Sequence, residues 1–402
     1  MTPEIKQRIE QICRGEVPEG YKKGKLGVVP EEWEETSFST LFTSTSDYTD
    51  DLEKYPLYSL TIEDGIIPKT ERYERSHLVK KEDSYKIVRP NDYAYNPMNL
   101  RFGAVARHKG DMPVAISGYY DIFTTVHESD LPFMDSFLTC GPMITYYNRV
   151  STGSLVEKQR VHFSQFLEFM LPLPSINERT KIAAILTTQD KVIELKEKRL
   201  AEKQRQKKYL MQQLLTGKKR LPGFAFEVEK TNIKAISTYS VSTISQTTLE
   251  SYEGKRLYPV FNANSIAGYV DFYENECPYI SIIKDGAGIG RVRLCEAKSS
   301  TIGTMGCIHA RKGISIIFLY YLLEQVDFNK YSNGSTIPHL YYKDYSCEKV
   351  RIPDIKEQAA IAEVLSAADR EIELLRQDIE QEKQKKKSLM QLLLTGIVRV
   401  RV

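Results

Sequence analysis

Residues 174–217 read PSINERTKIAAILTTQDKVIELKEKRLAEKQRQKKYLMQQLLTG, and residues 353–396 read PDIKEQAAIAEVLSAADREIELLRQDIEQEKQKKKSLMQLLLTG. The two stretches align without a gap at an offset of 179 residues, with roughly 19 identities over about 45 positions. Each opens on a proline and closes on Leu-Met-Gln-x-Leu-Leu-Thr-Gly. This repeat predicts a chain built as two half-molecules.

Both stretches have the periodicity of a coiled-coil helix, with seam positions that alternate in steps of four and three. In the second stretch the seam includes Ile361, Leu365, Ile372, Ile379, Leu389 and Leu393. The leading proline and the closing glycine are helix start and stop signals. Each helix would be on the order of 50–60 Å long. Packing the two helices together hides both apolar stripes, and an antiparallel pair is favoured because each helix follows a globular stretch. The alternative is a solvated, charged helix hairpin that acts only as a spacer.

The composition indicates a soluble globular protein. Of the 402 residues, 41% are hydrophobic and 27% are charged, and the mean hydropathy is −0.38. The longest apolar run, 314–323, is about half a membrane span, and the N-terminus has no apolar core of a signal peptide. Six cysteines show no CxxC spacing, which favours reduced thiols over zinc ligands or disulfides. We therefore expect a cytoplasmic protein without a membrane partner or a bound metal.

Pattern changes divide the chain into five parts. These are an N-terminal helix and connector (1–35), a first globular domain (36–172), a first long helix (173–217), a second globular domain (218–351) and a second long helix (352–402). Short runs predict strands at Tyr55–Ile62, Tyr85–Val88, Met143–Tyr147, Arg256–Phe261, Tyr269–Tyr273, Tyr279–Ile283 and Arg291–Leu294, and an apolar run predicts a helix at Ser315–Glu324. The expected fold class is α+β: two mixed α/β domains separated by two long antiparallel coiled-coil helices, with pseudo-two-fold symmetry.

The residues do not assemble a catalytic centre. The glycines of 284–290 superficially resemble a dinucleotide fingerprint, but a strand-like run follows them instead of a helix, so a hairpin is favoured. The sequence has no P-loop, HExxH or GxSxG motif, and Asn96-Pro97-Met98-Asn99 lacks the second proline of an amino-methyltransferase motif. The net charge is +3, with basic clusters at 196–199, 203–208, 218–220 and 383–387 that suit either solvated helix faces or contacts to phosphates. A binding scaffold is the favoured class.

Several signatures together carry a family resemblance. They are Leu26–Trp33 before the first domain, the PxIxE helix starts at Pro174 and Pro353, the Leu-Met-Gln-x-Leu-Leu-Thr-Gly endings, and Gly217–Phe224. With these, the chain resembles the DNA-specificity subunit of Type I restriction–modification systems over essentially its whole length. One departure is Glu178-Arg179 in the first copy, where the second copy keeps the family's Glu357-Gln358.

This resemblance implies a non-catalytic subunit with two target-recognition domains, each reading one half of a split site in double-stranded DNA. It also implies recruitment of two methyltransferase subunits, which carry S-adenosylmethionine, and of restriction (nuclease/translocase) subunits. The chain itself would hold no cofactor, and its helices would set the spacer between the half-sites.

Base readout needs amide or guanidinium side chains, and phosphate contacts need cations and hydroxyl groups. On this basis the predicted DNA-binding residues are Tyr95, Asn96, Asn99, Arg101 and Arg107 in the first domain, and Lys284, Arg291, Arg293, Asn333, Ser335, Thr336 and His339 in the second. The predicted partner contacts on the helices are Ile182, Leu186, Ile361 and Leu365, or neighbouring faces. Two alternatives remain open: a coiled-coil adaptor that joins two proteins without touching DNA, and an enzyme that uses the turn at 286–290.

Overall fold

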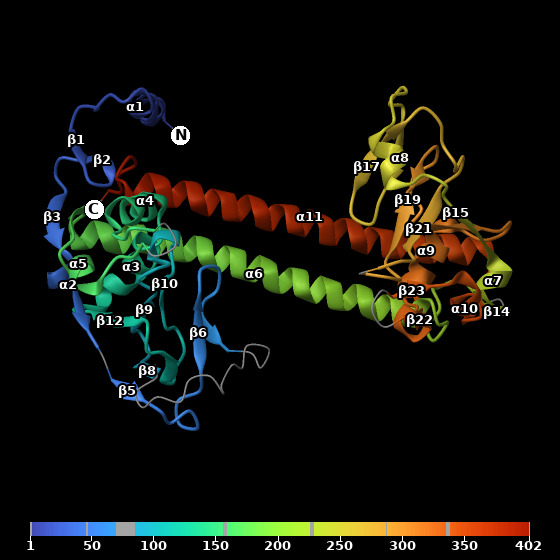
Figure 1. Cartoon of the computed structure of the whole chain (residues 1–402), viewed down its shortest axis with the longest axis horizontal. Helices are drawn as coiled ribbons and strands as arrows, with labels where there is room; N and C mark the ends of the chain where they lie inside the picture. Colours follow the sequence, from blue (N-terminus) through green and yellow to red (C-terminus); the bar gives the residue numbers. More distant parts are fainter. Residues whose placement is uncertain are drawn as a thin grey trace. The chain divides into compact units, whose positions relative to one another are not determined.

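The computed structural model describes residues 2–45, 47–69, 85–155, 159–225, 229–286, 288–334 and 338–401 (Figure 1). The chain forms two compact units, Met1–Leu195 with Ile379–Val402 and Lys196–Asp378. Two long helices, α6 (Ile176–Leu214) and α11 (Ile355–Leu394), each contribute one part to each unit. We call the globular part of the first unit insert 1 and that of the second unit insert 2.

The remaining elements follow in chain order. The first unit contains α1 (Pro3–Cys13), β1 (Tyr21–Gly24), β2 (Gly27–Pro30), β3 (Glu34–Ser37), α2 (Phe38–Leu41), β4 (Phe42–Ser44), β5 (Tyr48–Thr49), β6 (Tyr58–Thr61), β7 (Gly65–Pro68), β8 (Tyr85–Val88), β9 (Tyr93–Tyr95), η3 (Leu100–Phe102), β10 (Val105–Arg107), β11 (Val114–Ser117), β12 (Asp121–Thr125), η4 (Glu128–Asp130), α3 (Leu131–Phe137), α4 (Gly141–Val150), α5 (Phe163–Leu167) and β13 (Met170–Leu173). The second contains β14 (Glu229–Asn232), α7 (Ile233–Ile236), β15 (Ser237–Val241), α8 (Gln246–Glu250), β16 (Tyr258–Phe261), β17 (Ile266–Val270), β18 (Tyr279–Ile283), β19 (Val292–Cys295), β20 (Ser300–Thr301), β21 (Met305–Ala310), α9 (Ile316–Glu324), η6 (Phe328–Tyr331), β22 (Ser332–Asn333), β23 (His339–Leu340), α10 (Tyr342–Tyr345) and β24 (Lys349–Ile352).

The two long helices begin and end close to the predicted residues because the local signals are strong. Ser175 and Asp354 occupy equivalent positions before the two helices, and their side-chain oxygens accept hydrogen bonds from the first-turn amides of Glu178 and Glu357 at 3.4 and 3.3 Å. After the helices, Gly217 and Gly396 have φ angles of 68° and 69°, the left-handed conformation that ends a helix readily only at glycine.

Within each unit, the α6 segment and the α11 segment run antiparallel. In the second unit, Lys196 pairs with Asp378 at 2.8 Å and Lys207 with Asp369 at 2.7 Å, so the partner number falls as the α6 number rises. In the first unit, Gln189 donates to Glu382 at 2.7 Å. These polar contacts join the two helix segments within each unit. The predicted α+β class with an antiparallel helix pair is confirmed.

The seam residues predicted to contact a partner are instead core residues of this chain. Ile182 and Leu186 belong to the hydrophobic core of the first unit, and Ile361 and Leu365 to that of the second. Their exposed fractions are 2% or less. In the isolated chain these side chains are inaccessible because they cover the inserts, so this prediction is corrected to the neighbouring exposed faces of the same helices.

A buried carboxylate near the start of each long helix is held by an arginine beyond the end of the other one. Glu178 accepts hydrogen bonds from Nε and NH2 of Arg399 at 2.7 and 3.0 Å, and from the indole of Trp33 at 3.3 Å. In the second unit, Glu357 is held in the same way by Arg220. The two glutamates are one repeat offset apart in the chain, and so are the two arginines. The sequence repeat is therefore also a repeat of contacts. This ties the C-terminal segment of the chain to its N-terminal segment within the first unit.

The departure from the family pattern after Glu178 preserves one hydrogen bond. Nε of Arg179 donates to the carbonyl of Pro174 at 2.8 Å, and Nε2 of Gln358 donates to the carbonyl of Pro353 at 2.9 Å. Arg179 also forms an ion pair with the buried Asp130 at 3.0 Å. A glutamine at this position is neutral and could not form that ion pair. The replacement therefore keeps the helix start and adds a contact to insert 1.

The four-stranded sheets of the two inserts share one strand order although the insert sequences share little. In insert 1, the four-stranded sheet has the order β10-β9-β12-β4, and in insert 2 the order is β19-β18-β21-β15; all neighbours are antiparallel. Each insert also has a three-stranded sheet and is closed at its neck by a two-stranded ladder, β3–β13 or β14–β24. The chain thus repeats the four-stranded sheet and the neck ladder as well as the helices. The three-stranded sheets differ, because β16 pairs parallel with β20 whereas all strands of the β11-β8-β5 sheet are antiparallel.

Most predicted elements are present, and one is of the wrong type. Strands β8 and β18 have the predicted bounds, and α9 begins one residue after its predicted start, with Ser315 as N-cap. The run predicted as a strand at Met143–Tyr147 instead lies in helix α4. Pro142 occupies the first turn, where helices tolerate it, and the buried Met143, Tyr146 and Tyr147 follow the i, i+3, i+4 spacing of a helix face.

Candidate nucleic-acid interface

Five of the predicted DNA-binding residues, Asn96, Asn99, Arg101, Lys284 and Arg291, lie on equivalent connections of the two inserts. Residues 96–104 join β9 to β10, and residues 284–291 join β18 to β19. In each insert a second loop is hydrogen-bonded to this connection: the amide of Val161 donates to Pro97 at 3.1 Å, and the amide of Leu340 donates to Lys284 at 2.8 Å. Residues 161 and 340 are again one repeat offset apart. Each insert therefore presents the same pair of loops, filled with different side chains.

In insert 1, this connection is a turn that exposes the amide of Asn99 and holds a half-buried arginine, Arg101. Oδ1 of Asn96 accepts from the amides of Met98 and Asn99 at 3.0 and 3.3 Å, so Asn96 shapes the turn while Asn99 is exposed. Arg101 donates to Gln159 on the second loop at 3.0 Å, and its guanidinium lies 4.5 Å from the ring centroid of Phe102. Asn99 and Arg101 are thus held where they could meet a base edge or a phosphate.

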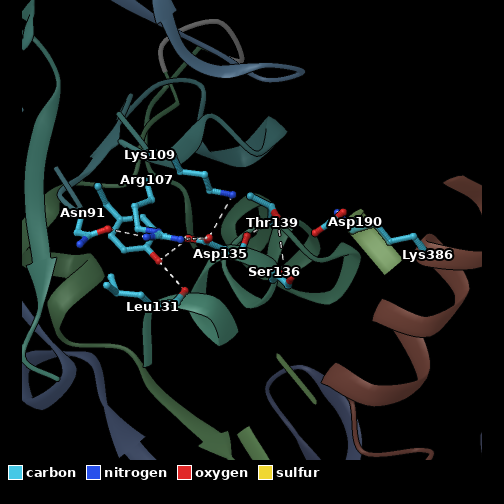
Figure 2. Close-up of polar contacts among 10 residues, drawn as sticks. Asn91, Arg107, Lys109, Leu131, Asp135, Ser136, Thr139, Asp190 and Lys386 are labelled. Carbon is cyan, nitrogen blue, oxygen red and sulfur yellow. Dashed lines mark hydrogen bonds and ion pairs between the residues drawn. The ribbon is translucent and has the colours of Figure 1, made fainter. Parts of the chain in front are cut away.

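Arg107, also predicted to contact DNA, is occupied inside the insert. Its Nε and NH2 donate to the two oxygens of Asp135 at 2.9 and 2.7 Å, its NH1 donates to Asn91, and only 17% of its side chain is exposed. Figure 2 shows Arg107 and Lys109 both directed at Asp135. Burial raises the pKa of Asp135, but the hydrogen bond from Arg107 and the charge of Lys109 outweigh it, so this pKa lies below its ordinary value. Arg107 is a structural ion-pair partner in this structure.

Tyr95 is a second correction in insert 1. It is fully buried, and its hydroxyl donates to the carbonyl of Val161 at 3.0 Å. All three residues of β9 are buried, so its side chains pack inside the insert on both faces. Tyr95 therefore links β9 to the second loop and is not accessible to a ligand.

In insert 2, the glycine-rich stretch forms the predicted hairpin. Gly286, Gly288 and Gly290 all have positive φ angles, and β18 pairs antiparallel with β19. A Cβ atom at Gly290 would lie 2.4 Å from Cβ of Phe328, so this position excludes a side chain. The hairpin is a turn between strands and not the strand–turn–helix of a dinucleotide site.

Lys284 and His339 meet at Asp285 beside this hairpin. Nζ of Lys284 lies 2.6 Å from the Asp285 carboxylate, and Nδ1 of His339 lies 2.7 Å from it. Burial raises the pKa of Asp285, but the hydrogen bonds from Lys284 and His339 outweigh it and hold the pKa below its ordinary value. Both predicted residues are therefore brought together, with part of their hydrogen-bonding capacity already used by Asp285.

Arg291 and Arg293 line an open cavity of about 430 Å³ on the same hairpin. NH2 of Arg291 donates to the carbonyl of Ala263 and to Oδ1 of Asn264, both at 2.9 Å, and NH2 of Arg293 donates to the carbonyl of Asn264 at 3.2 Å. NH1 of Arg293 is buried without a hydrogen-bond partner among the described residues. Two guanidinium groups and an asparagine thus converge on one concave surface, a donor and acceptor set suited to base edges.

The asparagines of this cavity, Asn262 and Asn264, were not predicted from the sequence. Oδ1 of Asn262 accepts from the amides of Asn264 and Ser265 at 2.9 and 2.8 Å, which forms a tight turn after β16. The signal that could have found them is the polar Asn-Ala-Asn-Ser turn after a predicted strand. Nothing in the sequence indicates that this turn lies against Arg291, which is 27 residues away.

One predicted residue, Asn333, lies at the start of the second loop of insert 2. Asn333 is exposed, and its amide donates to the carbonyl of Tyr331 at 3.1 Å and to Asp344 at 3.2 Å. Ser335 and Thr336 lie outside the described residues, so their assignment to DNA binding stays a prediction.

The described residues contain no group of three or more His, Cys, Asp or Glu side chains arranged to hold a metal ion. None of the helices in the described ranges combines the length and apolar character that a membrane crossing requires. All six cysteines are free thiols.

Comparison with known proteins agrees with the repeat and the topology. Residues 226–384 match the family described as "Type I restriction modification DNA specificity domain". A Methanocaldococcus jannaschii protein assigned as the MjaX specificity subunit of a type I restriction enzyme is 25% identical over 425 aligned positions, which cover 95% of this chain and 97% of the relative. The EcoprrI specificity subunit of Escherichia coli is 26% identical over 121 residues, or 30% of each chain. The crystal structure of a type I restriction–modification S subunit from M. genitalium superposes with a TM-score of 0.57 at 14% identity, covering 92% of this chain and 97% of the other.

Proposed function

Because the chain belongs to the family of DNA specificity subunits of type I restriction–modification systems, we propose that each insert reads one half of a bipartite site in double-stranded DNA. The long helices set the unspecified spacer between the two halves. The relatives are named as specificity subunits, in agreement with the prediction that this chain is not the catalytic component.

One observation carries the two-half-site proposal: equivalent strand connections present different readout groups. The β9–β10 connection offers Asn99 and Arg101, whereas the β18–β19 hairpin offers Arg291 and, from β19, Arg293, both hydrogen-bonded to Asn264. Asparagine pairs with adenine and arginine with guanine in the major groove, each bidentate contact being worth about 1–3 kcal/mol of discrimination. A common frame with different side chains is what reading two unlike half-sites requires.

The test is a genome-wide map of adenine methylation in cells with and without this gene. Loss of one bipartite motif, two short specified halves around an unspecified gap, supports the proposal and reports the target. Replacing Asn99 and Arg101 by alanine should relax one half of that motif, and replacing Arg291 and Asn264 should relax the other. A change in both halves from one replacement contradicts the assignment of one half to each insert.

We further propose that two methyltransferase subunits, which carry S-adenosylmethionine, dock on exposed apolar positions of the long helices, and that restriction subunits join this complex. Leu195 and Leu374 are one repeat offset apart and are 55% and 65% exposed. Ile176 and Ile355, at equivalent helix starts, are 46% and 49% exposed. Equivalent exposed apolar residues in the two units fit two copies of one partner.

Co-purification tests this docking. Leu195→Glu or Leu374→Glu alone should leave one methyltransferase subunit bound, and the double variant should leave none, because a charge on each apolar contact prevents its burial. Lys191→Glu is the matched control, since it places the same carboxylate on another exposed position of α6. Retention of two subunits by the double variant refutes docking at these residues.

A further inference from the structure

Phe102 is an exposed apolar side chain on the turn that carries the reading groups of insert 1. Its exposed fraction is 49%, whereas Leu100, two residues earlier on the same turn, is fully buried. Phe102 also lines an open cavity of about 510 Å³ beside this turn. A single exposed apolar residue is ordinary on a protein surface, so the groups around Phe102 decide whether it has a role.

Insert 1 holds the backbone of this turn in place. Nδ2 of Asn148, on α4, donates to the carbonyl of Arg101 at 2.7 Å and to the carbonyl of Ile144 at 3.0 Å. Gly103 closes the turn with a φ angle of 94°, a conformation that glycine adopts readily and other residues rarely do. The ring of Phe102 therefore projects from a backbone that α4 anchors.

The side chains of Asn99 and Phe102 share one face of the turn. The amide of Phe102 donates to the carbonyl of Asn99 at 2.9 Å, which is the i to i+3 hydrogen bond of a 3₁₀ turn. In such a turn, side chains three positions apart lie one above the other. Both residues are exposed. An exposed amide and an exposed aromatic ring are thus presented together.

Arg101 restricts how the ring of Phe102 can meet a nucleic acid. The guanidinium of Arg101 lies over this ring, 4.5 Å from its centroid. A ring that wedges between two bases stacks on both of them and needs both of its faces. Because a cation covers one face of Phe102, its edge and its other face remain for a ligand. This arrangement favours contact with the edge of a base over insertion between bases.

The cavity beside the ring does not suit the phosphate backbone. The carboxylates of Glu63 and Asp64 line it and repel phosphates. Its cations Arg107 and Lys109 are both paired with Asp135, at 2.7 and 3.3 Å. A base edge in the groove is therefore the occupant that the charges allow.

We infer that Phe102 contacts the C5-methyl group of a thymine in the half-site that insert 1 reads. The inference rests on the proposed function and adds a specificity-determining residue to it. The major-groove edge of an A·T pair presents N6 and N7 of adenine beside the methyl group of thymine; asparagine suits the adenine, and phenylalanine suits the methyl group. The adjacent Asn99 and Phe102 match this pair of features. Loss of one methyl-sized apolar contact weakens binding about fourfold.

The experiment compares thymine with deoxyuridine, which lacks only the methyl group. Binding of the full-length chain, purified with its co-expressed partner subunits, is measured on a duplex that carries the bipartite motif from the methylation map. Each thymine in the half that Asn99→Ala relaxes is replaced in turn. For the wild type, one replacement, at the relaxed position or next to it, should weaken binding about fourfold. Phe102→Ala should bind the thymine and deoxyuridine duplexes equally.

Two further variants are controls. Phe102→Leu keeps an apolar side chain and should keep most of the fourfold ratio. Val126→Ala shortens an apolar residue that is 50% exposed but follows the end of β12 that pairs with β4, away from the β9–β10 connection. This variant should keep the full ratio. Circular dichroism checks that each variant is folded.

A wild-type ratio near one at every thymine, or a fourfold ratio that persists in Phe102→Ala, overturns the inference. If Phe102→Ala binds neither duplex, Phe102→Leu decides: a retained ratio supports the methyl contact, and binding without the ratio, or no binding, refutes it. An unchanged ratio together with loss of a co-purified subunit also overturns the inference and assigns Phe102 to a protein contact.

Failure of the proposed function is distinguishable from failure of this inference. In the first case the methylation map lacks a bipartite motif, whichever variant is expressed. A bipartite motif whose thymines all give a ratio near one refutes the Phe102 contact alone.

Discussion

Removing Arg399 should destabilise the first unit strongly, although the residue lies next to the C-terminus. Arg399→Ala leaves the Glu178 carboxylate, 2% exposed, with the Trp33 indole at 3.3 Å as its remaining described hydrogen-bond donor from a side chain. Breaking a buried ion pair by removing one partner costs about 3–5 kcal/mol. Arg399 itself is 34% exposed, so solvent already screens part of the pair and the lower end, about 3 kcal/mol, is expected.

The assay is urea unfolding followed by tryptophan fluorescence. Trp33 is the sole tryptophan of the chain, is 2% exposed and contacts Glu178, so its emission reports on the first unit. With a urea m-value of about 2–3 kcal/mol/M, the loss corresponds to a midpoint lowered by about 1–1.5 M.

Replacing Glu178, the carboxylate of the pair, should lower the free energy of unfolding less than replacing Arg399. Glu178→Gln keeps an acceptor for Trp33, and Arg399 can still reach solvent and Glu32, which lies at 3.0 Å, so we expect a loss of about 1–2 kcal/mol. The double variant should resemble Glu178→Gln more than the sum of both losses, because the two residues act as one pair. Arg401→Ala, an exposed arginine two positions on, is the control and should change the stability by less than about 0.5 kcal/mol.

Two results would refute this reasoning. One is an Arg399→Ala variant that unfolds within about 0.5 kcal/mol of the wild type. The other is a Glu178→Gln variant less stable than Arg399→Ala, since the burial of the carboxylate requires the opposite order.

Three further predictions follow from the corrected site. Arg107 lowers the pKa of Asp135 in the fold, so this pair stabilises the protein above pH 3.8, and the stabilisation is lost as the pH falls below that value. Asp135→Asn should remove this part of the loss of stability in acid, which urea unfolding followed by Trp33 fluorescence from pH 7 to pH 3 would measure. Gly290→Ala should destabilise the β18–β19 hairpin by about 1–3 kcal/mol, because φ is 80° and the new Cβ meets Phe328 at 2.4 Å; hydrogen exchange of residues 279–295 should accelerate, and unchanged protection would contradict the steric argument. Tyr95→Phe should cost about 0.5–1.5 kcal/mol through its lost buried hydrogen bond and leave the methylation motif unchanged, whereas an altered motif would restore Tyr95 as a reading residue.

The repeated frame was predictable from the sequence because its signals are local. Heptad spacing, a leading proline and a closing glycine depend on residues a few positions apart, and they placed α6 and α11 nearly to the residue. The same holds for the hairpin at 286–290, where a strand-like run after the glycines excluded a nucleotide-binding helix. The helix α4 was missed because its short apolar run suits a strand as well as a helix, and burial decided between them.

The roles of individual polar residues were decided by the tertiary structure alone. Arginines at 101, 107, 291 and 293 are indistinguishable in sequence, but Arg107 pairs with a half-buried carboxylate from α3 while Arg291 faces an open cavity beside Asn264. The common strand order of the two four-stranded sheets was equally hidden in the sequence. The physical reason is that ion pairs and burial join residues far apart in the chain, such as Glu178 and Arg399, which are 221 positions apart, whereas the helix and turn signals join neighbours.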